Sequence, residues 1–433
     1  MENSILDLQN QMVVCDELNN AELSIPEQYT PLEYLNELWK RGLEEYIVPK
    51  GETSFGYLKI LSLTGLNAKY DKITDEIAER WKYELDKISS CGVTAFYLIL
   101  WDFIRYTKLN NLEVSPGCGA IPGSLVAYCL GITDVDPIKY NLIIDHFLSQ
   151  TKGVPGCRIE LEIGGSQRLT DYVIEKYGKG MMKLLEGLDI TFHDIADVSI
   201  IKETLKSISD NTAQPVESLM INYDDEEVFN LINSGGIKDT ELLRELNDDG
   251  VAKGIEARSM EDLIARLSLD RLGLEERCSE YIKNKNNPDS IHYGCPELEP
   301  ILASTYGYIV YQEQIMQILT ALGGLSPEES NLVRRGMSKR DFIFNKTARH
   351  DFIKGNVEKG ISGCVANGIS ETTAEKIFDN MWTAAIYGFN KAHAAAYATL
   401  TYRLAWLKHY YREEYIAAVE YVKTIQSQAG REE

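Results

Sequence analysis

The chain has 433 residues, of which 44% are hydrophobic and 25% are charged, which is ordinary for globular domains and excludes a disordered or fibrous protein. Its formal charge of -22 argues against binding of phosphate backbones over the whole surface, because like charges repel. No apolar run approaches the roughly 20 residues that span a bilayer, and the polar, acidic segment from Met1 to Asn20 is unlike a signal peptide, so we expect a cytoplasmic protein with no membrane contact.

The N-terminal part of the chain is expected to begin with an arm and continue in helices. Residues 1–30 are polar with no clear period, which predicts a weakly ordered arm. From Pro31 the apolar residues recur at three and four positions, which predicts an amphipathic helix. A second helix is predicted from Ile73 to Ser89, where an apolar stripe is bracketed by a charged face made of Asp75, Glu76, Glu79, Arg80, Lys82 and Glu84. The aromatic, apolar run from Val93 to Lys108 predicts a helix buried on most sides.

The middle of the chain combines a glycine-rich loop with short strand candidates. The loop runs from Ser115 to Ser124 and opens a further helix from Ser124 to Cys129. Strands are predicted from Leu142 to Phe147 and from Arg158 to Ile163, where acids and aliphatic residues alternate. After Gly178 the pattern is helical almost to the end. The eight cysteines show no zinc-ligand spacing, and we expect reduced, mostly buried thiols.

Several sequence blocks occur in an order typical of one protein family. The first group comprises Trp101 to Arg105, the glycine-rich loop, and Leu125 to Pro137. The second comprises Asp225 to Phe229, Leu242 to Leu246, and Ser259 to Ala265. The third comprises Thr305 to Gln314, Arg334 to Met337, and Tyr387 to Tyr397. Together these blocks resemble the palm and fingers of the C-family replicative polymerase of bacteria, the DNA polymerase III alpha subunit.

The resemblance implies an α+β, mostly helical fold with a small sheeted palm remnant, a helical thumb and a long helical fingers domain. It places the palm and thumb in residues 31–210, the fingers in residues 211–425 and a tail in residues 426–433. No block matches the family's metal-binding PHP domain or the regions beyond the fingers that hold the sliding clamp and template. Between Tyr177 and Met181 the family's palm is shortened.

The same resemblance points to carboxylates that would hold Mg2+ for catalysis. The family strand Pro-Asp-x-Asp-x-Asp-Phe corresponds here to Cys157 to Ile163, so Glu160 and Glu162 are the catalytic and metal-binding candidates. Each Glu is one methylene longer than Asp, and Arg158 occupies the first acidic position, so a charged Arg–Glu cluster is the expected alternative to a working site for two ions. Asp189 is the third candidate; an alternative alignment puts Thr191 there, and an ordinary Asp at a helix N-terminus also remains open.

The glycine-rich loop matches the family's phosphate cradle. Gly117 and Gly119 are the candidates for phosphate binding through backbone N–H groups. Cys118 and Ala120 stand where the family has Arg and Ser, so the cation and the hydroxyl are lost. A turn with a purely structural role is the alternative.

The fingers blocks supply the remaining nucleotide-binding candidates. The resemblance implies that four basic residues on one helix and its end contact the incoming triphosphate: Arg334, Arg335, Lys339 and Arg340. It also implies that four residues line the nucleotide side: Tyr387, Asn390, Lys391 and His393. A solvated basic face and, for the histidine, a satisfied core position are the alternatives.

Charge along the chain suggests two kinds of partner. Residues 331–410 hold 12 Lys and Arg against 6 Asp and Glu, so DNA or a dNTP is expected to bind there. Residues 211–250 hold 10 acids against Lys238 and Arg244, which suits a replication protein with a basic surface. The predicted function is a non-catalytic module in DNA replication that binds primer–template DNA, nucleotide or a replication protein. The alternative is an active DNA-directed DNA polymerase that uses Mg2+.

Overall fold

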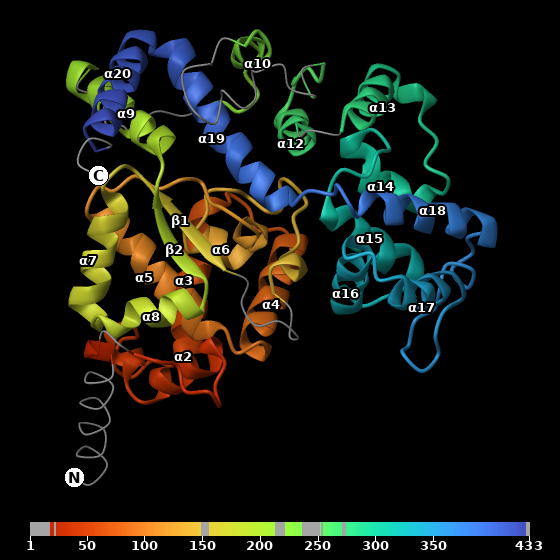
Figure 1. Ribbon diagram of the computed structural model, residues 1–433, viewed down its shortest axis with the longest axis horizontal. Coiled ribbons are helices and arrows are strands. Elements are labelled where there is room, and N and C mark those ends of the chain that lie inside the picture. The colour runs from red at the N-terminus through yellow and green to blue at the C-terminus, as the bar shows by residue number, and fades with distance from the viewer. Residues whose placement is uncertain are drawn as a thin grey trace. The chain divides into compact units, whose positions relative to one another are not determined.

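The computed structural model describes residues 18–20, 23–148, 156–212, 221–235, 252, 254–270 and 274–429, and of residues 342–344 the backbone alone. The chain divides into two compact units, which are described separately below. Unit 1 comprises residues 1–220 and 410–433, and unit 2 comprises residues 221–409. The described residues are mostly helical, with one two-stranded sheet, so the predicted α+β class is confirmed (Figure 1).

Nine of the labelled helices lie wholly in unit 1: α2 (Pro31–Lys40), α3 (Ser54–Lys69), α4 (Asp75–Ser90), α5 (Thr94–Leu109), α6 (Leu125–Cys129), α7 (Gly165–Tyr177), α8 (Gly180–Gly187), α9 (Ala196–Thr212) and α20 (Arg412–Ala429). Helix α2 begins with a capping box, in which Thr30 and Glu33 satisfy each other's backbone N–H groups. The predicted strand from Leu142 to Phe147 is wrong: a single 3-10 turn (Ile144–His146) lies there. Ile144 and Phe147 are buried, so the apolar run reflects core packing of a turn.

The sheet of unit 1 is formed by β1 (Cys157–Leu161) and β2 (Ile190–Asp194), which run parallel. Helices α7 and α8 form the crossover that a parallel pair requires. On the other side of β1, the N–H of Ser115 donates to the carbonyl of Glu160 at 2.9 Å. The sequence pattern predicted helix throughout this part of the chain and missed β2. A strand of five residues with exposed positions carries little periodic signal.

The core of unit 1 surrounds α5, and the side chains from Phe96 to Leu100 are completely buried. Leu18 and Leu23, which lie in the predicted arm, are also part of this core, whereas residues 1–17 lie outside the described residues. Helix α20 packs against α9, so residues 410–425 belong to unit 1 although the sequence placed them with the fingers (Figure 1).

Among the described residues, no single helix has the length and apolar content to cross a bilayer. Helices α4 and α5 pass such a test only as a pair, and the chain bends by 112° between them. The apolar side chains of α5 are used in the core of unit 1, as the sequence predicted.

Unit 2 contains α10 (Glu226–Asn233), α12 (Met260–Leu269), α13 (Glu275–Asn286), α14 (Glu299–Leu302), α15 (Gln312–Gly323), α16 (Pro327–Ser338), α17 (Phe342–Lys354), α18 (Glu371–Ala384) and most of α19 (Lys391–Tyr410). One apolar face of α15, from Ile315 to Leu322, is buried against α16 and α17. Phe352 of α17 and Phe378 of α18 pack against each other in the same core, with ring centroids 5.8 Å apart.

Candidate functional site

The acidic strand β1 carries two buried glutamates in different environments. Glu160 is 1% exposed, and its Oε1 lies 4.0 Å from Nη1 of Arg158, which is the predicted Arg–Glu pair. Glu162 instead faces Lys202, whose Nζ lies 2.5 Å from Oε1, and Arg168, whose Nη1 lies 3.9 Å from the same atom. The N–H of Glu113 donates to Oε2 of Glu162 at 3.2 Å. The charge of Glu162 is therefore balanced by the protein's own cations.

Asp189 lies at the far end of the sheet from these glutamates. The register pairs Cys157 with Ile190, so Asp189 stands opposite Gly156, and a Cβ added to Gly156 would lie 2.0 Å from Oδ2 of Asp189. Glu160 pairs with His193 in the same register. Four residues of strand separate the two acids, about 13 Å at the usual rise per residue. One alternative from the sequence was that Asp189 stands at the N-terminus of a helix. In the structure, Asp189 directly precedes strand β2.

The residues at hand therefore do not fit a pair of Mg2+ ions. Two such ions need carboxylates that converge within a few ångströms. Thr191, the alternative third position, has no carboxylate, and the register places it opposite Arg158. In the part of the chain that the structure describes, no group of three or more His, Cys, Asp or Glu side chains is placed to hold a metal ion.

The glycine-rich loop makes the tight turn that its sequence predicts. Gly117 and Gly119 have φ angles of 141° and 68°, in the region that only glycine adopts freely. A Cβ on Gly117 would lie 2.8 Å from Oγ1 of Thr133, so the loop also has no space for a side chain there. Thr133 anchors the loop, because its hydroxyl donates to the carbonyl of Pro116 at 2.6 Å.

Cys118, at the position of the family's arginine, lies beside Glu160. Burial of the thiol, and then the neighbouring carboxylate of Glu160, raise the pKa of Cys118 to about 12. The residue is only 6% exposed. The loop therefore offers a neutral thiol where the family has a cation, which removes attraction for phosphate.

We expect Cys118 to resist alkylation, because the thiolate is the reactive form and its population near pH 8 is very small. Iodoacetamide at pH 8 should modify Cys118 at least about a hundredfold more slowly in the folded chain than in urea, as followed by peptide mass spectrometry. Cys91, which is partly exposed, is the internal control. Equal rates at Cys118 in both states would contradict the placement of this thiol.

The far end of the loop is held by an ion pair that the sequence had assigned to the charged face of a helix. Glu84 of α4 is completely buried, and its carboxylate accepts hydrogen bonds from the N–H groups of Leu125 and Val126 and from the Ser124 hydroxyl, at 2.9 to 3.0 Å. Arg80 pairs with Glu84 at 2.7 Å and donates to the carbonyl of Gly123 at 2.9 Å. The N-terminus of α6 is thus capped from within the protein.

The four basic fingers candidates lie on α16 and just after it, as predicted, but have different surroundings. Arg334 is 7% exposed and donates to Gln312 at 3.1 Å and to Asn331 at 2.9 Å. Burial, followed by the charge of Arg335, lowers the pKa of Arg334 to about 10. Arg334 is therefore an internal residue of unit 2 and is not presented to a ligand.

The other three basic residues are more accessible. Arg340 has a positive φ of 56° and packs on Trp382, with its guanidinium 4.5 Å from the ring centroid. Arg335 is partly exposed and Lys339 is exposed, and neither has an ion-pair partner among the described residues. Arg335 and Lys339 are thus the two members of this group that are available to an anion.

The residues at the start of α19 are held largely by contacts within unit 2. Glu313 is 2% exposed and accepts hydrogen bonds from the N–H groups of Lys391 and Ala392, at 3.0 and 3.3 Å. Lys391 is 5% exposed, and its Nζ lies 3.0 Å from Oε1 of Glu261. Asn390 caps the helix by accepting from the N–H of His393 at 3.1 Å. These contacts give Asn390 and Lys391 structural roles in the folded unit.

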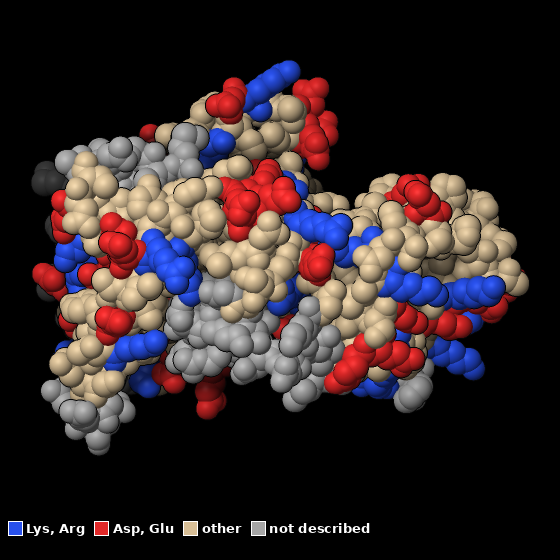
Figure 2. Space-filling model, turned by 90° about the horizontal axis from the view of Figure 1, so that it is seen from above, with Lys and Arg blue, Asp and Glu red and all other residues tan. Residues whose placement is uncertain are grey.

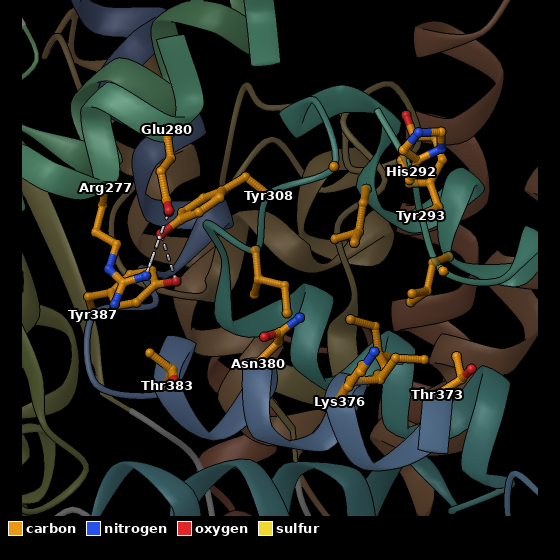
Figure 3. Close-up of a pocket in the computed structure, with 17 residues that line it drawn as sticks. Arg277, Glu280, His292, Tyr293, Tyr308, Thr373, Lys376, Asn380, Thr383 and Tyr387 are labelled. Atoms are coloured by element: carbon orange, nitrogen blue, oxygen red, sulfur yellow. Dashed lines mark hydrogen bonds and ion pairs between the residues drawn. The ribbon is translucent and has the colours of Figure 1, made fainter. Parts of the chain in front are cut away.

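His393 and Tyr387 lie at two different places. The His393 ring packs against that of Tyr397 in a tilted arrangement, with centroids 4.5 Å apart and an interplanar angle of 48°, and both residues are partly exposed. Tyr387 instead lines a cavity in unit 2, where its hydroxyl donates to that of Tyr308 at 3.2 Å (Figure 3). The four residues predicted to line a nucleotide site therefore do not share one wall.

Two positions that organise these sites were not singled out from the sequence. Glu313 lies within the family-like block from Thr305 to Gln314, so the motif was visible in the sequence although the role of Glu313 was not. Glu84 stands four residues after Arg80, which is the spacing of a common surface ion pair. Only the burial of both positions distinguishes them from solvated acids.

Comparison with known proteins places these observations in a family. Residues 33–265 match the model of the bacterial DNA polymerase III alpha NTPase domain, and residues 197–360 match that of the bacterial DNA polymerase III alpha subunit finger domain. The DNA polymerase III subunit alpha of Staphylococcus aureus strain COL is 28% identical over 497 residues, which cover 87% of this chain and 46% of the relative. That of Staphylococcus epidermidis strain ATCC 35984 is 27% identical over the same shares.

The chain spans about half the length of the curated relatives it matches. The aligned span of 497 residues exceeds the 433 residues of this chain, so the relatives carry internal segments that this chain lacks. This difference agrees with a shortened palm. The first of the two family models covers more than half of the sequence. The chain belongs to the bacterial DNA polymerase III alpha subunit family.

Proposed function

We propose that this chain is a non-catalytic family member that serves DNA replication by binding primer–template DNA through unit 2. The observation that carries the proposal is the register of the sheet, which separates Asp189 from Glu160 and Glu162. Polymerisation of dNTPs by two-metal phosphoryl transfer requires such acids to meet at both ions. The pairing of Glu162 with Lys202 supports the same conclusion, because the ammonium group of Lys202 already balances the charge of this carboxylate.

The electrostatics of unit 2 support a small basic contact with DNA. Several cations in residues 331–410 are already neutralised: Arg349 pairs with Glu375 at 3.2 Å, and Lys359 pairs with Asp351 at 2.7 Å. On the face shown in Figure 2, basic side chains lie in small groups among acidic ones. We therefore assign the phosphate contacts to Arg335 and Lys339. The acidic segment predicted to bind a replication protein falls largely on residues 213–220 and 236–251, outside the described residues.

A primer-extension assay tests the non-catalytic part of the proposal. With Mg2+ or Mn2+ and all four dNTPs, we expect no product above the level of the isosteric double variant Glu160→Gln/Glu162→Gln. The isosteric change keeps the shape of the strand, so a loss of folding does not confuse the result, and the thermal midpoint of the variant confirms this. Extension by the natural chain that the double variant abolishes would establish the alternative, an active polymerase.

Binding of primer–template DNA tests the second part. We expect the double variant Arg335→Ala/Lys339→Ala to weaken binding and to lower the slope of log Kd against log salt by roughly 2, because each phosphate contact releases about one counterion. Lys346→Ala, a change at an exposed lysine of α17, is the matched control. The slope of log Kd against log salt should be higher for this control than for the double variant. An unchanged slope in the double variant would refute the assignment of these contacts.

A further inference from the structure

Unit 2 contains a cavity of about 580 Å³, within the range of small-molecule sites. It lies among α13, α14, α15 and α18 (Figure 3). Its floor consists of five buried aliphatic side chains: Leu298, Leu302, Ile309, Ile318 and Ile377. A floor of this kind favours the flat, apolar part of a ligand.

The rim of the cavity carries polar groups that the fold does not use. Lys376 and Asn380 stand one helical turn apart on α18, and Figure 3 shows both side chains pointing towards the cavity, with His292 on the opposite side. None of these three side chains has a hydrogen-bond or ion-pair partner among the described residues. An ammonium, an amide and an imidazole are therefore all available to a ligand that brings acceptor atoms.

At the aromatic end of the cavity, in contrast, the polar groups already have partners within the protein. Tyr308 and Tyr387 are nearly parallel, with an interplanar angle of 20° and centroids 6.2 Å apart. Arg277 donates to the Tyr308 hydroxyl at 3.2 Å and lies 3.8 Å from Glu280. Since Glu280 balances Arg277, the uncompensated positive charge of the cavity lies at Lys376.

We propose that this cavity binds a small organic anion made of a planar ring and a phosphate monoester, of the size of an aryl phosphate or a nucleoside monophosphate. The ring lies on the aliphatic floor beside the tyrosines, and the phosphate accepts from Lys376 and Asn380, which stand one turn apart on α18. A phosphate group suits the end of the cavity at Lys376, because its terminal oxygens can accept several hydrogen bonds from the ammonium and amide donors there. The site is separate from Arg335 and Lys339, so it extends the proposed function and does not depend on it.

Isothermal titration of the full chain with AMP, phenyl phosphate, adenosine and inorganic phosphate tests the proposal. We expect saturable binding of AMP or phenyl phosphate with a Kd below about 1 mM, and weaker binding of adenosine and of inorganic phosphate. Binding of AMP alone identifies a nucleotide ligand, and equal binding of both esters identifies a general site for phosphate monoesters that carry a planar ring. No saturable binding of either ester, or equal binding of inorganic phosphate, overturns the proposal.

Variants locate the binding. Lys376→Glu, which reverses the free charge, and Asn380→Trp, which fills the mouth from an exposed position, should each weaken binding of the ester about tenfold or more. Lys283→Glu, at an exposed lysine of α13 outside the cavity, is the matched control and should bind normally. Loss of binding in Arg335→Glu with normal binding in Lys376→Glu would place the ligand elsewhere and refute the assignment. Thermal midpoints show whether each variant is folded.

Discussion

Replacing Glu84 with alanine is expected to lower the free energy of unfolding of unit 1 by about 3 to 5 kcal/mol, because it removes one partner of a buried ion pair. The change leaves the N–H groups of Leu125 and Val126 without their acceptor and leaves Arg80 without its carboxylate. Each unsatisfied buried donor adds roughly 1 to 3 kcal/mol of cost, although water can reach Arg80, whose side chain is 20% exposed. Urea denaturation followed by circular dichroism measures the loss.

Two further variants make this prediction specific. Glu79→Ala, at an exposed acid on the same helix, should change stability by no more than about 0.5 kcal/mol. Glu84→Gln keeps the shape and one acceptor oxygen, so its loss should lie between those of the two alanine variants. Hydrogen exchange should rise first in peptides that cover residues 121–130, since the cap is lost there. If Glu84→Ala were as stable as Glu79→Ala, the buried cap would be disproved.

Replacing Glu313 with alanine is expected to destabilise unit 2 by about 2 to 4 kcal/mol, because two buried N–H groups lose a charged acceptor. Those groups belong to Lys391 and Ala392, at the N-terminus of α19, where a negative charge is favourable. The helix start should fray, and the motif from Asn390 to His393 should lose its geometry. Hydrogen exchange of peptides that cover residues 388–396, with urea denaturation, measures this effect.

The control for Glu313 is Glu358→Ala, at an exposed acid of unit 2 that pairs with no described residue. It should leave both the stability and the exchange of α19 unchanged. Glu313→Gln retains one acceptor oxygen and should recover roughly half of the loss. Normal protection of α19 in Glu313→Ala would show that the helix start does not depend on this carboxylate.

Glu84 and Glu313 have the same physical role, each next to one of the sequence blocks that resemble the family. Each is a buried carboxylate that caps a helix with family-like residues. Glu84 caps α6 after the glycine-rich loop, and Glu313 caps α19, which begins at Lys391 directly after Asn390. Much of what appears in the sequence as a nucleotide-binding motif is therefore used to hold the scaffold together. The same is true of Arg334, which is occupied by Gln312 and Asn331.

Helices with strong local signals could be predicted from sequence, and the missed strand shows why others could not. The structure places α4 at Asp75–Ser90 and α5 at Thr94–Leu109, within two residues of the predicted bounds, because apolar spacing acts within each helix and Thr74 caps the start of α4. Strand β2 forms only because it pairs with β1, more than 30 positions earlier in the chain. Pairing between segments so far apart produces almost no recognisable pattern in a sequence of five residues.

The sequence by itself determined the family, the α+β class and the spacing of Glu160 and Glu162 on one strand, since motifs and periodicity depend on neighbours along the chain. Only the tertiary structure decided which charged side chains are buried and what compensates them. A buried charge costs several kcal/mol unless a partner is near, and for Glu162 and Lys391 that partner comes from a distant part of the chain. Glu84 has a local ion-pair partner in Arg80, but the N–H groups that it binds belong to Leu125 and Val126, about 40 residues later. The register that separates Asp189 from Glu160 is likewise a property of the folded sheet.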